Sequence, residues 1–176
     1  MVLHHTAGTN SLNYIVNTNP YAPVRACHFL VDRDGTVQVV SGVGAYHAGK
    51  GGAYKFSRTV TILKDQGNQN LYGIEIESKG STATISNALG AINIEQVVST
   101  ALLCAALLDA MRPTWRSLPV LRVIRHKDWT PRKVDVRQDL DWWHQVIGIA
   151  RRNKKDAAKA EREILAFVKA HPKGVM

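Results

Sequence analysis

The chain has 176 residues, is 45% hydrophobic and carries a formal net charge of +9. A chain of this length and composition is expected to fold as one main domain with a full hydrophobic core, which excludes an intrinsically disordered protein. No apolar run reaches the roughly 20 residues of a membrane-spanning helix, and the first residues lack the basic and apolar regions of a signal peptide.

Short strands are predicted in the first part of the chain. Residues 2–6 are predicted to be a strand that begins almost at the first residue, which suggests an excised domain. Residues 28–31 and 36–40 are β-prone and flank an Asp-Gly pair at 34–35, the pattern of a β-hairpin. Segments rich in glycine, asparagine or proline are predicted to be loops: 17–23, 41–52 and 64–70.

A further strand is predicted within residues 71–78. There Ile74 and Ile76 alternate with Glu75 and Glu77, so one face of the strand is apolar and the other faces solvent or a functional site. This alternation places two carboxylates on one face of the predicted sheet.

Helices are predicted in the second half of the chain. Asn93 is a candidate N-cap with Gln96 in the capping-box position, and the apolar helix that follows, to about Met111, is expected to be largely buried. The remaining predicted elements are a loop at 113–119, a strand at 120–124, and helices at 140–149 and 156–170. This order of elements predicts an α/β fold with a central mixed β-sheet flanked by helices.

The basic residues are concentrated near the C-terminus. From residue 151 onward there are eight Lys/Arg against three Asp/Glu, a net charge of +5, which leaves +4 of the total for residues 1–150. We divide the chain into a domain at 1–150 and a basic helical tail or linker at 151–176. Three interpretations of the tail stay open: a solvated helix face, a linker to a further domain, and a segment that adheres to an anionic cell wall.

Two histidines and an aspartate are candidate metal ligands. Because neighbouring side chains on a strand point to opposite faces, only one of His4 and His5 can face a given site. His126 follows the last predicted strand, and Asp135 lies nine residues further on. Two histidines and one carboxylate are a ligand set of catalytic zinc with one open position. The spacing is not a compact motif, so the residues by themselves favour structural histidines over a metal site.

Five segments occur in an order that is typical of one family. They are His4–Ala7, His28–Gly35, Ala45–Gly49, Gly73–Glu77 and His126–Asp135. Together they resemble the N-acetylmuramoyl-L-alanine amidase type 2 family, which includes phage endolysins, cell-wall recycling amidases and peptidoglycan recognition proteins. The resemblance spans roughly residues 1–147. The amino-acid sequences of these segments are most similar to those of endolysins from phages that infect actinobacteria.

The resemblance implies an enzyme that cleaves the amide bond between N-acetylmuramic acid and L-alanine in peptidoglycan, with Zn²⁺ as its cofactor at one edge of the sheet. The implied zinc ligands are His4, His126 and Asp135. The implied catalytic residues are Glu75 as general base and Lys133. Zinc would polarise the scissile carbonyl and acidify water, Glu75 would carry a proton to the leaving amine, and Lys133 would stabilise the developing oxyanion.

Two features depart from the family pattern. Cys27 stands where some members have a catalytic tyrosine, so the base role falls to Glu75, as in the recycling subgroup. Asp135 fits the place of the third zinc ligand better than Cys27 does. The loop from Pro131 to Asp135 is one residue shorter than in relatives with Pro-Gly-Arg-Lys, which bears on the placement of Lys133.

Other polar residues are candidates for secondary roles. Glu77 competes with Glu75 for the base role, and only the family resemblance favours Glu75. His47 is interpreted either as a wall of the substrate groove or as an ordinary loop histidine. Thr6 and Arg132 are further candidate substrate contacts. Five residues are interpreted as structural: His5, His28, Trp129, Trp142 and Trp143.

The enzyme hypothesis is weighed against two others. As an enzyme, the chain is expected to be a monomeric phage endolysin, made in the host cytoplasm without a signal peptide and acting on the cell wall after its release. The alternative within the family is a non-catalytic peptidoglycan-binding module, but such members typically lose a zinc ligand. Nucleic acid is not an expected partner, because that idea rests on charge alone and no basic–aromatic stripe supports it.

Overall fold

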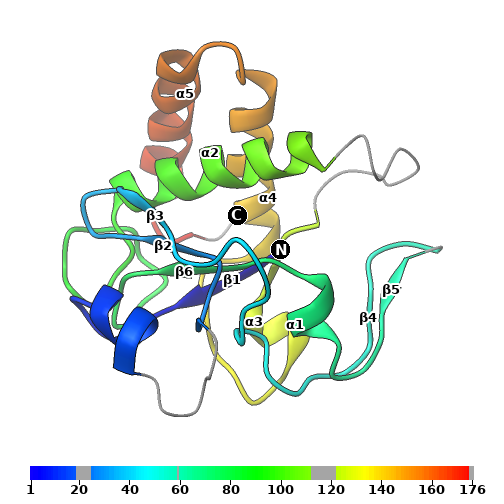
Figure 1. Ribbon diagram of the computed structural model, residues 1–176. Helices are drawn as coiled ribbons and strands as arrows, with labels where there is room; N and C mark the ends of the chain where they lie inside the picture. Colours follow the sequence, from blue (N-terminus) through cyan, green and yellow to red (C-terminus); the bar gives the residue numbers. More distant parts are fainter. Residues whose placement is uncertain (19–24, 59, 112–121, 175–176) are drawn as a thin grey trace.

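A computed structural model describes residues 1–18, 25–58, 60–111 and 122–174 (Figure 1). Its main sheet has five strands in the order β3-β2-β6-β1-β7. Strands β1, β2, β6 and β7 are parallel, whereas β3 pairs antiparallel with β2 at one edge. The strands are β1 (Val2–His5), β2 (Phe29–Val31), β3 (Val37–Val39), β6 (Gly73–Ile76) and β7 (Ile124–Arg125). The mixed sheet predicted from the sequence is confirmed.

The β2–β3 hairpin forms where the Asp-Gly pair predicts it. The Gly35 N–H donates to the carbonyl of Asp32 over 3.0 Å, and Gly35 has a positive φ of 83°, which glycine adopts without steric cost. The backbone N–H of Asp32 then donates to the carbonyl of Thr36 over 2.9 Å and closes the turn. The turn sets the register in which Phe29 pairs with Val39.

Several short elements were not predicted. Strands β4 (Tyr54–Lys55) and β5 (Thr61–Ile62) form a separate two-stranded sheet. Helix α1 (Gly67–Asn70) is a single turn inside a predicted loop, and η1 (Tyr14–Thr18) is a turn of π-helix. The predicted loop at 113–119 lies outside the described residues, as do positions 19–23 of the loop at 17–23 and positions 120–121 of the strand at 120–124.

Helix α2 (Ile94–Ala110) begins at the predicted capping box. The Gln96 N–H donates to Asn93 Oδ1 over 2.9 Å, and the Asn93 N–H donates to Gln96 Oε1 over 3.1 Å. A cap of this kind stabilises a helix by about 1 kcal/mol. The face that contains Val97 and Cys104 is buried, whereas Ala106 is exposed, so the helix is less completely buried than its apolar sequence predicts.

The helices α2, α4 (Leu140–Arg152) and α5 (Ala157–Ala170) cover one face of the sheet (Figure 1). The main core lies between this helical layer and the sheet. It contains Leu3 and Ile74 from the strands together with Trp142 and Trp143 from α4, all of them fully buried. The interpretation of these two tryptophans as packing residues agrees with their burial.

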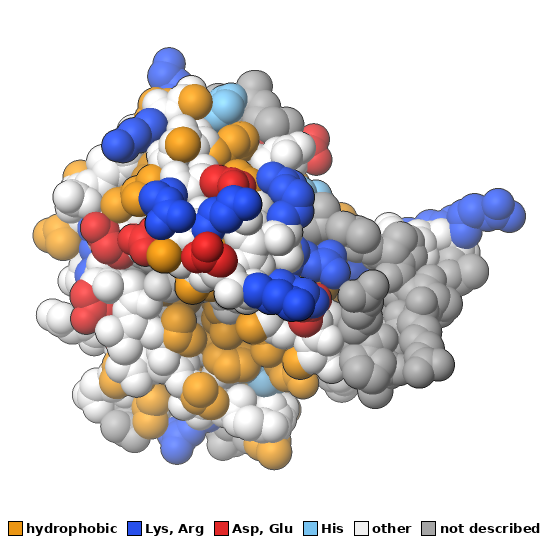
Figure 2. Space-filling view, turned by 90° about the horizontal axis from the view of Figure 1, so that it is seen from above, with side chains coloured by type: hydrophobic (Ala, Val, Ile, Leu, Met, Phe, Trp, Pro, Cys, Tyr) orange, Lys and Arg blue, Asp and Glu red, His pale blue; other side chains and the backbone are white. Residues whose placement is uncertain are grey.

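The basic C-terminal segment folds onto the same core. Ile164 and Val168 of α5 are buried within it, and α4 continues to Arg152, past the division that we placed at residue 150. Figure 2, which views the molecule from the side of α2 and α5, shows Lys and Arg side chains interspersed with Asp and Glu. The described part of the chain contains no helix long and apolar enough to cross a membrane.

The opposite face of the sheet carries α1, α3 (His126–Trp129) and the long loops (Figure 1). A smaller core here contains Val2, Ala48, Ile124 and Trp129. Trp129 is 2% exposed and packs closely on Gly51, where an added β-carbon would lie 2.3 Å from its Nε1. This core holds the segment around Ala48 against the ends of β1 and β7.

Candidate metal and catalytic site

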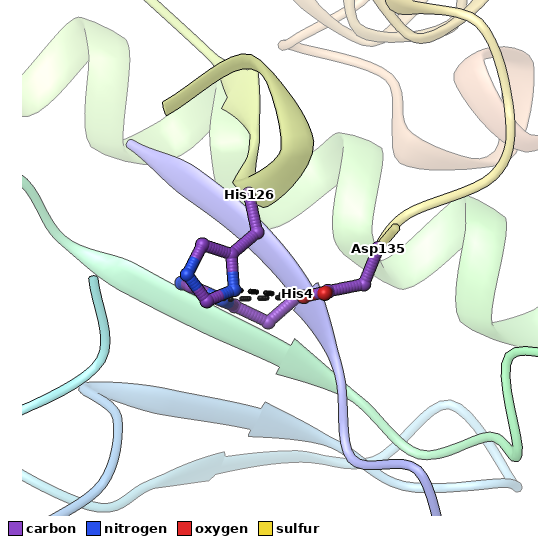
Figure 3. A group of neighbouring side chains, drawn as sticks. All are labelled: His4, His126 and Asp135. Carbon is purple, nitrogen blue, oxygen red and sulfur yellow. Dashed lines mark hydrogen bonds and ion pairs between the residues drawn. The ribbon is translucent and has the colours of Figure 1, made fainter. Parts of the chain in front are cut away.

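His4, His126 and Asp135 converge on one point (Figure 3). The Nδ1 atoms of His4 and His126 lie 2.8 Å apart, and Asp135 Oδ2 lies 3.0 Å from His126 Nδ1 and 3.5 Å from His4 Nδ1. All three side chains are buried, with 1%, 5% and 6% of their residues' surfaces exposed. The structure thus brings together three residues that are far apart in the sequence.

The strands explain why these side chains meet. Val2 pairs with Ile124 across β1 and β7, and side chains two residues apart on a strand share a face, so His4 is directed to the side on which His126 follows. His126 opens helix α3 directly after β7. The Asp135 carbonyl accepts from the Lys127 N–H over 2.9 Å, which holds the Asp135 loop beside α3. The site lies at the carboxyl ends of parallel strands, where such sheets commonly bind ligands.

The hydrogen bonds of His4 and His126 determine which ring nitrogen of each carries the proton. The His126 ring donates from Nε2 to the Ala48 carbonyl over 3.2 Å, because a carbonyl can only accept. His47 likewise donates from Nε2 to the Leu71 carbonyl over 2.8 Å, which leaves its Nδ1 to accept from His4 Nε2 over 3.1 Å. The Nδ1 atoms of His4 and His126 are therefore both lone-pair donors directed at the same point.

This arrangement fits a bound cation. Three electron-pair donors, two Nδ1 atoms and one carboxylate oxygen, lie 2.8–3.5 Å apart in a buried site. Ligands about 2.0–2.1 Å from a tetrahedral zinc ion are ~3.3 Å from one another, close to these spacings. Without a positive charge between them, such donors repel one another.

The electrostatic environment keeps these groups in the forms that bind metal. Burial lowers the pKa of His4 to about 4, so its ring is neutral at physiological pH. Burial alone raises the pKa of Asp135, but its close contacts with the rings of His126 and His4 hold the pKa of its carboxyl group well below its usual range. A neutral imidazole and an ionised carboxylate are the forms that coordinate a cation.

Glu75 lies beside His4, one of the candidate metal ligands. It pairs in register with His4 across β6 and β1, so the two side chains project from the same face of the sheet. Burial raises the pKa of Glu75 to about 8, the charge of Asp135 raises it further, and the charge of Lys133 opposes these effects. Its Oε2 atom is buried and has no hydrogen-bond partner among the residues that the structure describes. A carboxyl group with a raised pKa and a buried oxygen that no described residue contacts is suited to proton transfer.

Glu77, the competing carboxylate, is committed to backbone contacts. Its Oε1 accepts from the Ser11 N–H over 2.9 Å, and its Oε2 accepts from the Arg33 N–H over 3.3 Å. Strand β6 ends at Ile76, so Glu77 lies beyond the regular alternation from which we placed it beside Glu75. Both carboxylate oxygens are occupied in holding loops together.

Lys133 is exposed in the loop that leads to Asp135. Its backbone N–H donates to the Thr130 carbonyl over 3.2 Å, which shapes this loop. Its positive charge lowers the pKa values of both His4 and Glu75, although burial is the largest influence on each. Lys133 therefore contributes positive charge to the site from an exposed position.

The three candidate substrate contacts have different surroundings. His47 is buried beneath His4 with both ring nitrogens bonded, rather than on an open groove wall. The Thr6 hydroxyl donates to the Gly8 carbonyl over 2.9 Å and accepts from the Ser78 N–H over 3.2 Å, so it joins the ends of β1 and β6. Arg132 is exposed and donates to the Lys50 carbonyl over 2.6 Å.

The remaining candidates have surroundings typical of structural residues. Cys27 is fully buried beside Ile15 and Leu30, where burial raises the pKa of its thiol, and it is not part of the metal-binding group. His28 accepts the Gly73 N–H at its Nδ1 over 3.0 Å. His5 accepts the Ala7 N–H at its Nδ1 over 3.2 Å. The sequence contains no signal that marks His47 and Ala48 as partners of His4 and His126.

A mixed sheet with two histidines and an aspartate at its strand ends defines an α/β domain with a possible metal site. The family model for N-acetylmuramoyl-L-alanine amidase matches residues 1–138, and the chain belongs to this family. Its activity is the hydrolysis of the amide bond between N-acetylmuramic acid and L-alanine, and its substrate is peptidoglycan. The family resemblance seen in the five sequence segments is confirmed. Neither a curated protein sequence nor a solved structure matches the chain significantly.

Proposed function

We propose that this amidase depends on zinc, with His4, His126 and Asp135 as its protein ligands and a fourth position open to water and substrate. The observation that carries the proposal is the convergence of two unprotonated Nδ1 atoms and one ionised carboxylate oxygen. Two imidazoles with one carboxylate are a ligand set of catalytic zinc sites. Carboxylate–imidazole sites also bind other divalent ions, so metal analysis of the purified protein belongs to the test.

We assign the proton transfers to this chain's own carboxylate and ammonium groups. A bound zinc ion would supply Lewis acidity toward the scissile carbonyl and toward the attacking water. Glu75 takes a proton from that water and delivers it to the departing L-alanine nitrogen. The ammonium of Lys133 stabilises the negative charge on the carbonyl oxygen. Loss of one such donor typically costs about 2.7–4 kcal/mol in the transition state.

We also propose that the protein is a phage endolysin that acts as a monomer on the host cell wall. The support is the amino-acid sequence of the motifs, notably His126-Lys127-Asp128-Trp129 followed by Lys133-Val134-Asp135. The net charge of +9 favours association with an anionic wall. In this proposal residues 1–150 form the catalytic domain, and the helix within 151–176 is a basic appendage that packs on it.

The test is hydrolysis of purified peptidoglycan. Incubation with the zinc-loaded protein is expected to release new N-terminal alanine, and a chelator is expected to abolish this release until zinc is restored. Walls of several chemotypes should be compared, because lysis of actinobacterial walls in particular supports the endolysin assignment. Binding without release from any of them, by folded and zinc-loaded protein, supports a peptidoglycan-binding module instead.

A further inference from the structure

Two consecutive residues contact the two ligand histidines from behind. His47 accepts from His4 Nε2 through its ring over 3.1 Å, and Ala48 accepts from His126 Nε2 through its carbonyl over 3.2 Å. Each contact lies at the ring nitrogen opposite the one that faces the candidate metal. One dipeptide therefore controls the tautomer of both histidines.

The dipeptide is itself held in place by a side chain from α1. Asn68 Oδ1 accepts the backbone N–H groups of both His47 and Ala48, over 3.0 and 2.8 Å. The β-carbon of Ala48 packs against Gly67, where an added β-carbon would lie 2.6 Å away. The short helix, which no sequence pattern predicted, thus presents one amide oxygen to two successive residues.

The ring of His47 has little freedom to turn. Its Nε2 donates to the Leu71 carbonyl over 2.8 Å, and its Cγ lies 2.3 Å from the place of an added β-carbon on Gly73. The ring also meets those of His4 and His28 edge to face, with centroids 5.3 and 5.4 Å apart. Because a backbone carbonyl cannot donate, the proton stays on Nε2 and the Nδ1 lone pair stays directed at His4.

We infer that His47 is a positioning residue for the metal centre: it accepts the Nε2 proton of His4 and thereby keeps the His4 Nδ1 lone pair directed at the metal. This inference rests on the proposed metal site. Partners that orient a metal-bound histidine contribute ~10–100-fold to metal affinity. The substrate contact that the sequence suggested for His47 is replaced by a contact with a ligand.

Two substitutions separate this role from simple packing. His47→Leu keeps an apolar group of similar size beside Gly73 but removes both polar atoms. His47→Asn is smaller but places an amide oxygen near the position of Nδ1. If the acceptor matters, the Asn variant should bind zinc within a few-fold of the native protein, whereas the Leu variant should bind it ~10–100-fold more weakly. If packing alone matters, the order of the two variants is reversed.

The measurement is zinc affinity by competition with a chromophoric chelator, with circular dichroism to verify folding. His144→Leu is the matched control, because His144 also donates its Nε2 proton to a carbonyl, that of Val123 over 2.9 Å, but lies on α4. This control should keep native zinc affinity. Asn68→Ala is a second variant that leaves all site rings intact, and it should weaken zinc binding several-fold by releasing the dipeptide.

Nitrogen NMR of the His4 ring in the metal-free protein gives a readout that needs neither zinc nor activity. The native protein and His47→Asn should carry the His4 proton on Nε2, and His47→Leu should lose this preference. Native zinc affinity in His47→Leu, or equal loss in the Leu and Asn variants, overturns the inference. Failure of the native protein to bind zinc overturns the proposed metal instead, and the NMR comparison still tests the His47–His4 contact.

Discussion

His4 and Glu75 are direct neighbours on the parallel strands β1 and β6, and their side chains project from the same face of the sheet. His4 converges with His126 and Asp135, and Glu75 has a buried side-chain oxygen without a partner among the described residues. The strand register therefore places a candidate base beside one candidate metal ligand without any contribution from loops. This relationship distinguishes Glu75 from Glu77, which the sequence pattern treats alike.

Replacing these two glutamates should have opposite consequences. Glu75→Gln is expected to lower turnover of peptidoglycan by ~10²–10⁴-fold while zinc affinity is retained, because it removes only the proton-transfer group. Glu77→Gln should keep most of the turnover but lower the free energy of unfolding by about 1–3 kcal/mol, because Glu77 accepts from Ser11 and Arg33. Steady-state kinetics and thermal unfolding of both variants test this. Full activity in Glu75→Gln contradicts the assignment of the base.

The stability of the metal-free protein should depend on the ionisation of Glu75. Its pKa is raised from 4.5 to about 8 on folding, mainly by burial. A raised folded-state pKa means that the contribution to stability is fully present below pH 4.5 and is lost as the pH rises through 8. Glu75→Gln should therefore become more stable than the native protein across this window, by an amount on the order of a few kcal/mol. Urea unfolding at pH 5, 7 and 9 measures the difference.

Saturating zinc is the control for this pH effect. A cation beside Glu75 favours its ionised form, so zinc should flatten the pH dependence of the native protein relative to Glu75→Gln. A difference between the two proteins that does not change with pH contradicts a raised pKa.

Metal binding and charge stabilisation should separate in two further variants. Asp135→Asn removes the anionic ligand and is expected to abolish both zinc binding and activity. Lys133→Ala should keep zinc affinity while turnover falls by ~10²–10³-fold, because the ammonium group is proposed to act on the transition state. Zinc stoichiometry by elemental analysis, together with alanine release, checks both. Lys127→Ala, in the neighbouring helix α3, is the control that should keep metal and activity.

Gly73 should tolerate no side chain. A β-carbon at this position would lie 2.3 Å from the His47 ring, so Gly73→Ala must displace the ring. We expect a loss of about 1–3 kcal/mol in the free energy of unfolding and weaker zinc binding. Gly42→Ala is the matched control, because an added β-carbon there meets nothing within 4 Å. Equal behaviour of the two variants in thermal unfolding and zinc titration would count against close packing of His47 on β6.

The C-terminal helix should unfold together with the rest of the protein. Ile164 is fully buried in the main core, so Ile164→Ala is expected to cost about 2–5 kcal/mol while zinc affinity is unchanged. Glu161→Ala, on the exposed side of the same helix, should change stability by no more than about 0.5 kcal/mol. Denaturant unfolding followed by two probes tests this. Two separate transitions support an independent tail.

Most of the longer elements could be predicted because their signals are local. The Asp-Gly pair at 34–35 and the Asn93–Gln96 capping box act within four residues, and both features are present in the structure. The sheet β4–β5 and the helix α1 were missed, because elements of two to four residues leave no periodic pattern. Such elements form through contacts with distant segments, as Asn68 of α1 does with the backbone of His47 and Ala48.

The sequence by itself determined the family, the mixed α/β fold and the types of side chain in the candidate site. The reason is that ordered motifs and strand alternation depend on residues close together in the sequence. Only the tertiary structure decided which nitrogen of each histidine faces the candidate metal position, which glutamate keeps an oxygen without a partner among the described residues, and that His47 lies behind His4. The physical reason is separation along the chain. His4 meets His47 across 43 positions and His126 across 122, and contacts between residues so far apart in the sequence depend on how the whole sheet and its loops pack.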